Sequence, residues 1–309
     1  MTIEKNHLMK SKKKRKGLDS ESVTGYLLIA PTIVTFIIFL YIPFFNALQT
    51  SFYKYNGIGA LTNFVGFNNY IKVLTDIKFM KSLFNTFELI LAGFVGIPIG
   101  FILAYILYQG VVGKKFFSAA LFVPYLISMV VVGCIWKIIY DPTIGPLNQI
   151  LEGIGLSKFA VAWLSRPTTA IWAIAVVWIW RSTPFNMLII YANIMKMPSD
   201  FLEAAEIDGA NLWQKLVYII IPYLKPSFLV LGMLNITNSL RLFDLIWVMT
   251  KGGPGGASDV MTSYIYTKAF TNLDFGLGTA ASVVLMVIMM GIMMIKSAAQ
   301  TLVKRREKA

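Results

Sequence analysis

Six long apolar blocks constrain what this chain of 309 residues can fold into. Each block runs for about 20 residues or more with few charges, the length that a helix needs to cross roughly 30 Å of hydrocarbon. A water-soluble helix would instead pair an apolar stripe with a polar face. The blocks cover residues 26–48, 83–108, 116–140, 168–192, 227–249 and 276–295. We therefore predict an all-α integral membrane protein with about six transmembrane helices.

The composition agrees with lipid as the solvent and excludes several chemistries. Hydrophobic residues make up 57% of the chain and charged residues only 14%, against about 25% in soluble domains. The single cysteine, Cys134, rules out an intrachain disulfide. The single histidine, His7, argues against a histidine dyad or a His/Cys metal site. We expect no catalytic residues, no metal and no cofactor on this chain.

Basic residues gather at the two ends of the chain. The net charge is +13, and much of the excess lies in clusters that flank the first and last apolar blocks. Such clusters are typical of cytoplasmic anchors against anionic lipid, so we interpret them as membrane contacts rather than as a nucleic-acid site. We predict basic cytoplasmic tails at 1–24 and 296–309, on either side of a six-helix transmembrane domain over 25–295.

The distribution of lysine and arginine predicts the orientation. With the N-terminus in the cytoplasm, seventeen of these residues lie in inner segments and eight in outer segments, the bias expected of a cytoplasmic side. Both termini are therefore predicted to be cytoplasmic. The first apolar run is too long for the core of a signal peptide, so we expect an uncleaved span. The long outer segments 50–82, 141–167 and 250–275 are candidates for receiving a partner.

One long polar stretch, at about 196–222, lies between spans on the predicted cytoplasmic side. Ser199 is a good N-cap for a short helix, and Gly209 can supply a left-handed stop. Asn211 can cap a second helix, whose apolar residues recur at helical spacing until Pro222, where we expect it to end. The stretch is predicted to form a helix–turn–helix at the cytoplasmic surface.

The first of these two helices is acidic. Its carboxylates are Asp200, Glu203, Glu206 and Asp208. The alternative to a protein dock is an amphipathic helix resting on lipid, but such helices favour lysine and arginine on the polar face. Two small residues, Ala204 and Ala205, leave the helix surface low enough for the cleft of another protein to close over it. We interpret the helix as a protein-docking element.

The residues of this stretch match a known motif. The matching residues are Glu203-Ala204-Ala205, Asp208-Gly209-Ala210 and Ile221-Pro222. Together they resemble the EAA loop of ATP-binding-cassette (ABC) importer permeases, in the version of the carbohydrate-uptake branch that includes maltose, raffinose and glycerol-phosphate systems. Pieces at 26–31, 41–52, 67–70 and 250–254 are similar to the same branch, so the resemblance covers about 25–295.

The resemblance implies a permease subunit of an ABC sugar importer in a bacterial inner or plasma membrane. Such a chain forms half of an alternating-access pathway for a sugar or oligosaccharide. Its implied partners are a second homologous permease, two copies of a cytoplasmic ATPase and an extracytoplasmic solute-binding protein. ATP and magnesium would bind the ATPase, because the stretch 110–114 lacks the spacing of a phosphate-binding loop.

The resemblance also implies roles within the hairpin. Glu203 would pair with a basic residue in a groove of the ATPase, the two alanines would permit close approach, and Gly209 would make the turn. Trp213 stands where an aromatic residue packs the second helix. The predicted ATPase-coupling residues are Glu203, Ala204, Ala205, Asp208, Gly209, Ala210 and Trp213.

Polar residues cluster in the fourth and fifth spans, where they are costly unless they face a cavity or the protein interior. The clusters are Trp178, Trp180, Arg181, Ser182, Pro184, Phe185 and Asn186, and Asn235, Thr237, Asn238, Ser239, Arg241 and Asp244. Sugars need aromatic faces for their C–H faces and amides or hydroxyls for their OH groups. By resemblance to maltose-type permeases, the predicted substrate-path residues are Trp180, Arg181, Ser182, Phe185, Asn238, Ser239 and Arg241.

Simpler roles compete for these residues. Arg241 and Asp244 lie three positions apart and could neutralise each other. Tryptophans could belong to an interfacial belt, and asparagine or serine could join helices. Arg181 and Arg241 could also favour an anionic solute.

Two other function classes are possible for a chain of this composition. An ion-gradient-driven secondary transporter is the main alternative, but the only clear carboxylates in spans are Glu88 and Asp244, and the acidic hairpin would have no role. A membrane-embedded enzyme lacks candidates, because the spans contain no histidine and the sequence has neither a His-Glu-x-x-His nor a Gly-x-Ser-x-Gly motif.

Overall fold

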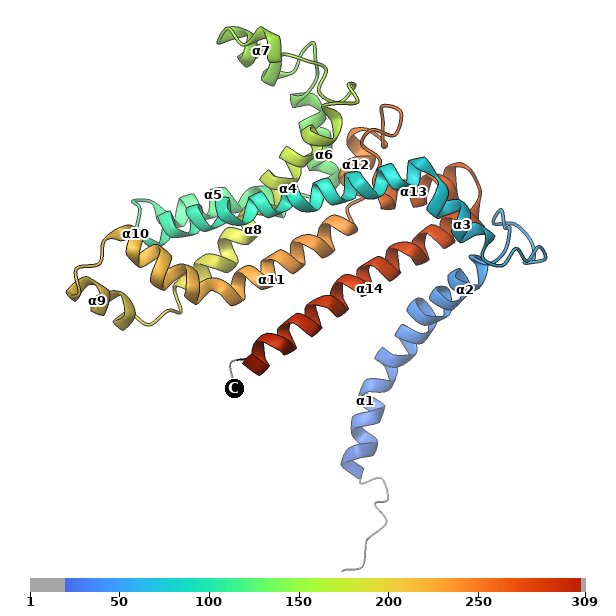
Figure 1. Ribbon diagram of the computed structural model, residues 1–309, viewed down its shortest axis with the longest axis horizontal. Helices are drawn as coiled ribbons and strands as arrows, with labels where there is room; N and C mark the ends of the chain where they lie inside the picture. Colours follow the sequence, from blue (N-terminus) through green and yellow to red (C-terminus); the bar gives the residue numbers. More distant parts are fainter. Residues whose placement is uncertain (1–19, 307–309) are drawn as a thin grey trace, which may run out of the picture. The chain divides into compact units, whose positions relative to one another are not determined.

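The computed structural model describes the backbone of residues 20–306 and the side chains of residues 25–294. Within these bounds the chain is helical, with one isolated β-bridge between Tyr53 and Phe64 and no strand (Figure 1). Most of the predicted N-terminal tail, 1–19, and residues 307–309 lie outside the described residues. The chain divides into a first part that ends at Gln49 and a second part that begins at Thr50.

The first part is an apolar helix with a π-helical turn in its middle. It consists of α1 (Ser20–Phe36), η1 (Ile37–Tyr41) and α2 (Ile42–Thr50) up to the last residue of that helix. The amide of Ile42 donates to the carbonyl of Ile37, five residues back, directly before Pro43. Proline has no amide hydrogen for an α-helical bond, and the wider turn accommodates it without ending the helix. The apolar stretch Gly25–Thr50, 26 residues long, confirms the first predicted span.

Four further spans lie in the second part. They are α4 (Ile77–Tyr108), α8 (Ala170–Ile194), α11 (Ile221–Leu240) and α14 (Phe275–Arg306). By length and composition they confirm the second, fourth, fifth and sixth predicted spans. The last of them continues past the predicted end at residue 295, because no proline or glycine interrupts the helical sequence there.

The fifth span begins far earlier than predicted. The short helix α10 (Leu212–Lys215) continues through a second π-helical turn, η3 (Leu216–Ile220), into α11. The amide of Ile221 donates to the carbonyl of Leu216, and Pro222 follows directly, in the same arrangement as at Pro43. The prediction that Pro222 ends the helix is therefore wrong, since the π-helical turn again absorbs the missing amide hydrogen.

The third predicted span is not one straight helix. Two helices, α5 (Lys114–Leu126) and α6 (Met129–Ile139), meet there at a bend of 97°. Ile127 and Ser128 between them are extended, and the hydroxyl of Ser128 caps α6 by accepting a hydrogen bond from the amide of Val131 at 3.3 Å. The described residues thus contain five helices that can span a membrane, or six if this bent pair is one span.

Short helices occupy the segments between the spans. They are α3 (Asn68–Thr75), α7 (Pro146–Gly153), η2 (Ser157–Phe159), α9 (Asp200–Ile207), α12 (Asp244–Met249), α13 (Met261–Tyr266) and η4 (Thr267–Thr271). The fifth span ends at Leu240, and a non-helical step separates it from α12, so the predicted span 227–249 is too long at its end. All three predicted outer segments therefore contain ordered helical structure.

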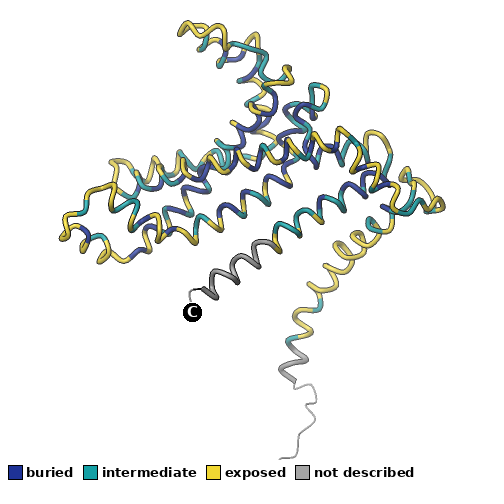
Figure 2. Tube along the Cα trace, viewed as in Figure 1, coloured by how far each residue is buried: buried dark blue, intermediate teal, exposed yellow. Residues whose placement is uncertain are grey.

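A row of glycines brings α4 close to α8 and α11. Gly93, Gly96 and Gly100 lie three and four positions apart, and hence on one face of α4. A Cβ atom added to Gly100 would lie 2.9 Å from the backbone nitrogen of Met187 on α8, closer than side chains normally approach. Small residues permit such contacts between membrane helices. Buried residues follow the facing sides of α4, α8 and α11 in Figure 2.

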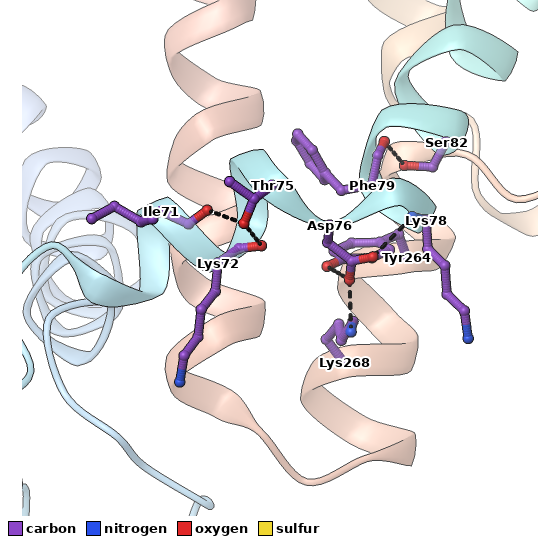
Figure 3. A network of polar contacts seen from close by, with 9 residues as sticks. All are labelled: Ile71, Lys72, Thr75, Asp76, Lys78, Phe79, Ser82, Tyr264 and Lys268. Atoms are coloured by element: carbon purple, nitrogen blue, oxygen red, sulfur yellow. Dashed lines mark hydrogen bonds and ion pairs between the residues drawn. The ribbon is translucent and has the colours of Figure 1, made fainter.

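Polar contacts tie the start of α4 to α13 and η4. Asp76 caps α4 by accepting from the amide of Lys78 at 2.8 Å. Its carboxylate also accepts a hydrogen bond from the hydroxyl of Tyr264 at 2.7 Å and pairs with Lys268 at 3.0 Å (Figure 3). Burial raises the pKa of the Asp76 carboxyl, but the hydrogen bonds from Tyr264, Lys268 and Lys78 outweigh it, so the pKa lies below its ordinary value.

A second carboxylate, Asp259, lies in the loop that precedes α13. The side-chain amide of Asn85 on α4 donates to the backbone carbonyl of Asp259 at 2.7 Å and holds this loop against α4. The Asp259 carboxylate accepts a hydrogen bond from the hydroxyl of Ser263. Burial raises the pKa of the carboxyl by more than Ser263 and the nearby charges of Lys78 and Lys81 lower it.

Replacing Gly100 by alanine should loosen α4 from α8, because the added methyl group meets the backbone of Met187. We expect a lower melting temperature in detergent and a loss of about 1–3 kcal/mol in the free energy of unfolding, as is usual for overpacking. Gly291→Ala is the matched control, since a Cβ on this helical glycine meets nothing within 4 Å. Equal melting temperatures for the two variants would contradict the close approach.

Replacing Asp259 by asparagine should raise the melting temperature at alkaline pH, and the difference should vanish as the pH falls through the pKa of the carboxyl. Folding raises that pKa, so the wild type gains stability as it takes up the proton, and asparagine imitates the protonated form. Asp141→Asn is the control, because hydrogen bonds from the amides of Ile144 and Thr143 lower the pKa of Asp141, whose stabilisation is lost in acid. Detergent melting curves over a pH series measure both trends, which should have opposite signs.

Candidate functional site

A cavity lies where two helical spans are interrupted. One interruption is the bend between α5 and α6, and the other is the non-helical step between α11 and α12. Irregular backbone at membrane depth is tolerated where it is buried in protein or lines a polar space. The cavity has a volume of about 270 Å³. It is lined by Tyr125, Met129, Trp178, Arg181, Ser182, Phe185, Asn186, Leu234, Asn235, Asn238, Arg241, Leu242, Phe243 and Asp244.

One wall of the cavity is aromatic and carries a positive charge. The rings of Tyr125 and Phe185 stack with centroids 5.0 Å apart. The guanidinium carbon of Arg181 lies 4.3 Å from the centroid of the Tyr125 ring, within the range of a cation–π contact. This wall therefore joins α5 to α8 and offers flat apolar faces beside a hydrogen-bond donor.

Two buried donors of this cavity have no partner. Among the side chains that the structure describes, Trp178 Nε1 and Arg181 Nε are the buried nitrogen or oxygen atoms without a hydrogen bond. An unsatisfied buried donor costs about 1–3 kcal/mol. The indole also requires glycine opposite, since a Cβ on Gly93 would lie 2.8 Å from Trp178 Nε1. Both donors belong to residues that line the cavity, although the two nitrogen atoms are themselves buried.

The α11 wall supplies amides. The side-chain amide of Asn235 donates to the carbonyl of Ile90 at 2.9 Å, which fixes its orientation against α4. Ser239, which the sequence placed on the substrate path, is buried beneath this wall and donates to Asn235 Oδ1 at 3.5 Å. Asn238 is more exposed and lines the cavity directly. The amide of Asn238 is therefore more available to a ligand than the amide of Asn235, which is already hydrogen-bonded.

Charged groups of both signs meet at the same cavity. Arg241 ends α11, and Asp244 begins α12 beyond the helix break. They form no ion pair: the two ion pairs between described residues are Lys215–Glu206 and Lys268–Asp76. The alternative role, in which Arg241 and Asp244 neutralise each other on one helix, is therefore not met, because the helix ends between them. Over the same part of the chain, no three His, Cys, Asp or Glu side chains could hold a metal ion.

Most of the predicted substrate-path residues meet here. Arg181, Ser182, Phe185, Asn238 and Arg241 line the cavity. Four further lining residues belong to the polar clusters of the fourth and fifth spans but not to the predicted substrate path, namely Trp178, Asn186, Asn235 and Asp244. Two aromatic lining residues outside these clusters, Tyr125 and Phe243, lie next to the two helix breaks. The proline before Tyr125 was the available signal.

Trp180 lies elsewhere. It lines a second, apolar cavity of about 490 Å³ between α4, α5 and α8, together with residues such as Ile99, Pro124 and Thr183. Trp178 and Trp180 are two positions apart on α8, and hence on different faces. Trp178 is 5% exposed and Trp180 is 39% exposed. The structure therefore brings Trp178, rather than Trp180, to the polar cavity.

The acidic hairpin forms as a helix–turn–helix from α9 to α10. Ser199 precedes α9 as predicted, but its side chain makes no capping hydrogen bond. Gly209 has a φ of +74°, the left-handed stop that its sequence position predicted. Asn211 and Gln214 form a capping box, with hydrogen bonds of 2.9 and 2.8 Å at the start of α10. An ion pair of 2.7 Å between Glu206 and Lys215 closes the hairpin.

The predicted coupling residues differ in exposure. Ala205 is buried inside the hairpin, whereas Ala204 and Glu203 are exposed on its surface. Trp213 is 72% exposed, so the described residues of this chain leave most of its side chain uncovered, in contrast to the packing role that the resemblance implies. Four further large apolar side chains of the hairpin and the turn that follows it are also exposed, namely Phe201, Ile207, Leu212 and Tyr218.

Comparison with known proteins gives the family. Residues 96–309 match the family described as "Binding-protein-dependent transport system inner membrane component". The chain is 31% identical to the probable ABC transporter permease protein YurN of Bacillus subtilis, over 88% of this chain and 94% of that protein. It is 32% identical to the trehalose/maltose transport system permease protein MalF of Thermococcus litoralis, over 87% and 91%.

A solved structure agrees with these sequence relatives. The chain is similar to a subunit of a bacterial ABC transporter involved in the import of the acidic polysaccharide alginate, with a TM-score of 0.80 and 25% identity over 90% of this chain and 95% of that one. The prediction of a multi-pass membrane permease is confirmed, and the secondary transporter and the enzyme are not supported. The chain belongs to the binding-protein-dependent transport system inner membrane component family and is a permease subunit of an ABC importer.

Proposed function

We propose that this permease subunit carries a sugar or oligosaccharide through the polar cavity between α8 and α11. The single observation that carries the proposal is that two residues with buried donors that lack partners, Trp178 (Nε1) and Arg181 (Nε), line a cavity that has a stacked aromatic wall. Sugar hydroxyls can accept from both donors while a ring face packs on Tyr125 or Phe185. The relatives' names include transport of trehalose, maltose and arabinooligosaccharides.

The charges of the cavity also suit hydroxyl groups. Arg181, Arg241 and Asp244 can each form paired hydrogen bonds with neighbouring hydroxyls of one sugar ring. The two guanidiniums and one carboxylate leave a net positive charge, which also accepts an acidic sugar. Anionic solutes also occur in the names of similar proteins. One relative is named for sn-glycerol-3-phosphate transport, and one structural neighbour is involved in the import of the acidic polysaccharide alginate.

The proposed site residues follow from the lining. We propose that Trp178, which lines the polar cavity, contacts the sugar. Trp180 lines the other cavity, and Ser239 donates a hydrogen bond to Asn235, so neither is proposed as a sugar contact. The proposed sugar contacts are Tyr125, Trp178, Arg181, Ser182, Phe185, Asn186, Asn238, Arg241 and Asp244.

The α9–α10 hairpin is proposed as the ATPase-coupling element. Its exposed residues include the carboxylate of Glu203, the small side chain of Ala204 and large apolar side chains such as Trp213. Large apolar side chains that are exposed beside charged ones are typical of protein contacts. The other predicted members stand in supporting places: Ala205 inside the hairpin, and Asp208, Gly209 and Ala210 at its turn.

The proposed assembly contains two related permeases, two ATPase subunits that bind ATP and magnesium, and an extracytoplasmic solute-binding protein. A second similar structure, of an alginate transporter, holds a pentasaccharide-bound periplasmic protein, which supports the last partner. We propose residues 25–295 as the transmembrane domain of a bacterial inner or plasma membrane protein, with the coupling loop at about 196–222. The basic ends 1–24 and 296–309 face the cytoplasm in this orientation.

Trp178→Phe should raise the KM for sugar uptake by roughly 2- to 10-fold, the value of one lost hydrogen bond. Trp180→Phe, the same change two positions along α8, should leave the KM unchanged. The assay is uptake by the complete importer in vesicles of maltose, trehalose, arabinotriose, diacetylchitobiose and glycerol 3-phosphate. A larger effect of Trp180→Phe would refute the assignment of the cavity, and no uptake of any probe by the wild type would refute the substrate class.

Glu203→Lys should weaken binding of the ATPase subunit by about tenfold or more, because the reversed charge faces a basic groove in the proposed complex. Glu152→Lys, the same change on the exposed helix α7, should leave the ATPase bound. Co-purification of the ATPase at increasing salt measures both variants. Wild-type retention of the ATPase and wild-type uptake in Glu203→Lys would exclude the hairpin as the docking element.

A further inference from the structure

Six aromatic rings form a continuous row that starts at the polar cavity. This aromatic track consists of Phe243, Trp247, Tyr266, Phe270, Phe275 and Tyr55. The centroids of successive rings lie 5.5, 4.5, 5.1, 5.4 and 6.4 Å apart. Phe243 also lines the cavity, so the track and the cavity share a ring.

Helix geometry explains why the middle of the track is rigid. Tyr266 and Phe270 are four residues apart and lie on one face of the α13–η4 segment. Tyr264 and Lys268 lie on the opposite face, where both contact the carboxylate of Asp76 at the start of α4 (Figure 3). One face is therefore fixed against α4, while the other presents its rings away from that contact.

The exposure of the track differs from that of a packed core. Phe270 is 58% exposed, and the other five rings are half-buried. Tyr264, on the opposite face, is buried. The rings of the track pack edge-on or tilted against one another at several steps, so part of each ring remains accessible.

We infer that the aromatic track is a second carbohydrate site, which receives the sugar rings of an oligosaccharide on the outer side and leads them to the cavity. The inference rests on the proposed sugar transport. Flat aromatic faces pack on the C–H faces of sugar rings, and a row of them holds several units of a chain at once. Exposed polar side chains that follow Tyr55 and Phe270 in the sequence, those of Asn56, Thr271 and Asn272, can bind the hydroxyl groups.

An interfacial aromatic belt is the competing explanation, because tryptophan and tyrosine gather at the level of lipid headgroups. A belt has no reason to connect with an internal polar cavity. The track does connect, since the ring of Phe243 stacks on Trp247 at an interplanar angle of 19° and also lines the cavity. This continuity favours a sugar as the occupant.

Trp247→Leu and Tyr266→Leu test the track, because leucine keeps apolar bulk and removes the flat ring. The assay is uptake by the complete importer of three pairs of probes: maltose and maltotetraose, arabinobiose and arabinotetraose, and diacetylchitobiose and its tetramer. For the pair that the wild type transports, each variant should raise the KM for the tetrasaccharide by roughly three- to tenfold, the value of one aromatic contact, and the KM for the disaccharide by less.

Two controls separate stacking from a structural role. Tyr266→Phe keeps the ring and should retain the wild-type KM for the tetrasaccharide. Trp172→Leu, at an exposed position on α8 outside the track and the cavity, should leave uptake unchanged. A KM increase in either control as large as that in Tyr266→Leu would overturn the inference.

The outcomes also separate the track from the proposed function. If both leucine variants keep the wild-type KM for the tetrasaccharide while Trp178→Phe impairs uptake, the track is refuted and sugar transport through the cavity stands. If the wild-type importer transports none of the six probes, the proposed substrate class falls, and the track falls with it.

Discussion

Hydrocarbon offers no hydrogen-bond partner to a peptide group, so every interruption of a helix within the membrane must be covered by protein, by water or by a change in the helix itself. Two kinds of interruption occur among the described residues of this chain, one in which the helix is modified and one in which it stops. At Pro43 and Pro222 a π-helical turn directly before the proline moves the amide bonding to five residues back, and the helix continues. At 126–129 and 240–244 the helix stops, and both stops border the polar cavity.

The position of the cavity depends on how closely α4 approaches its neighbours. Gly93 and Gly100 remove the side chains that would otherwise separate α4 from α8 and α11. The close approach lets Asn235 reach the carbonyl of Ile90 and leaves space for the indole of Trp178. A polar wall in an apolar span is therefore maintained by residues that carry no polar group at all.

Much of the fold follows from the sequence because hydrophobic length alone determines which segments span a membrane. Five spans and the α9–α10 hairpin, with its left-handed Gly209 and its Asn211 cap, were predictable from these local rules. The bend at Ser128 was not, since a capping serine inside an apolar block looks the same in a straight helix. Pro222 led to the wrong prediction that the helix ends there, because composition does not reveal the π-helical turn that lets the helix continue.

The candidate site was predictable in part. Polar residues in spans identified Arg181 and Asn238, but residue type alone could not separate Trp178 from Trp180, which face different cavities from the same helix. Helix phase relative to α4 decides between them, and that depends on the glycine packing. The ATPase-coupling and substrate roles remain predictions, to be tested with the variants described for the hairpin and the cavity.

The helix that leaves the hairpin is also the helix that ends at the cavity. From Leu212 to Leu240 it runs for 29 residues, about 43 Å at 1.5 Å per residue. In the proposed importer this helix is a stiff rod: a push on the hairpin by a closing motor subunit displaces Asn238 and Arg241 at the far end without any relay through loose side chains. The two interruptions of regular α-helical bonding in this rod, the π-helical turn at Leu216–Ile220 and Pro226, both lie in its motor-side half, so the half that carries Asn238 and Arg241 is an unbroken α-helix.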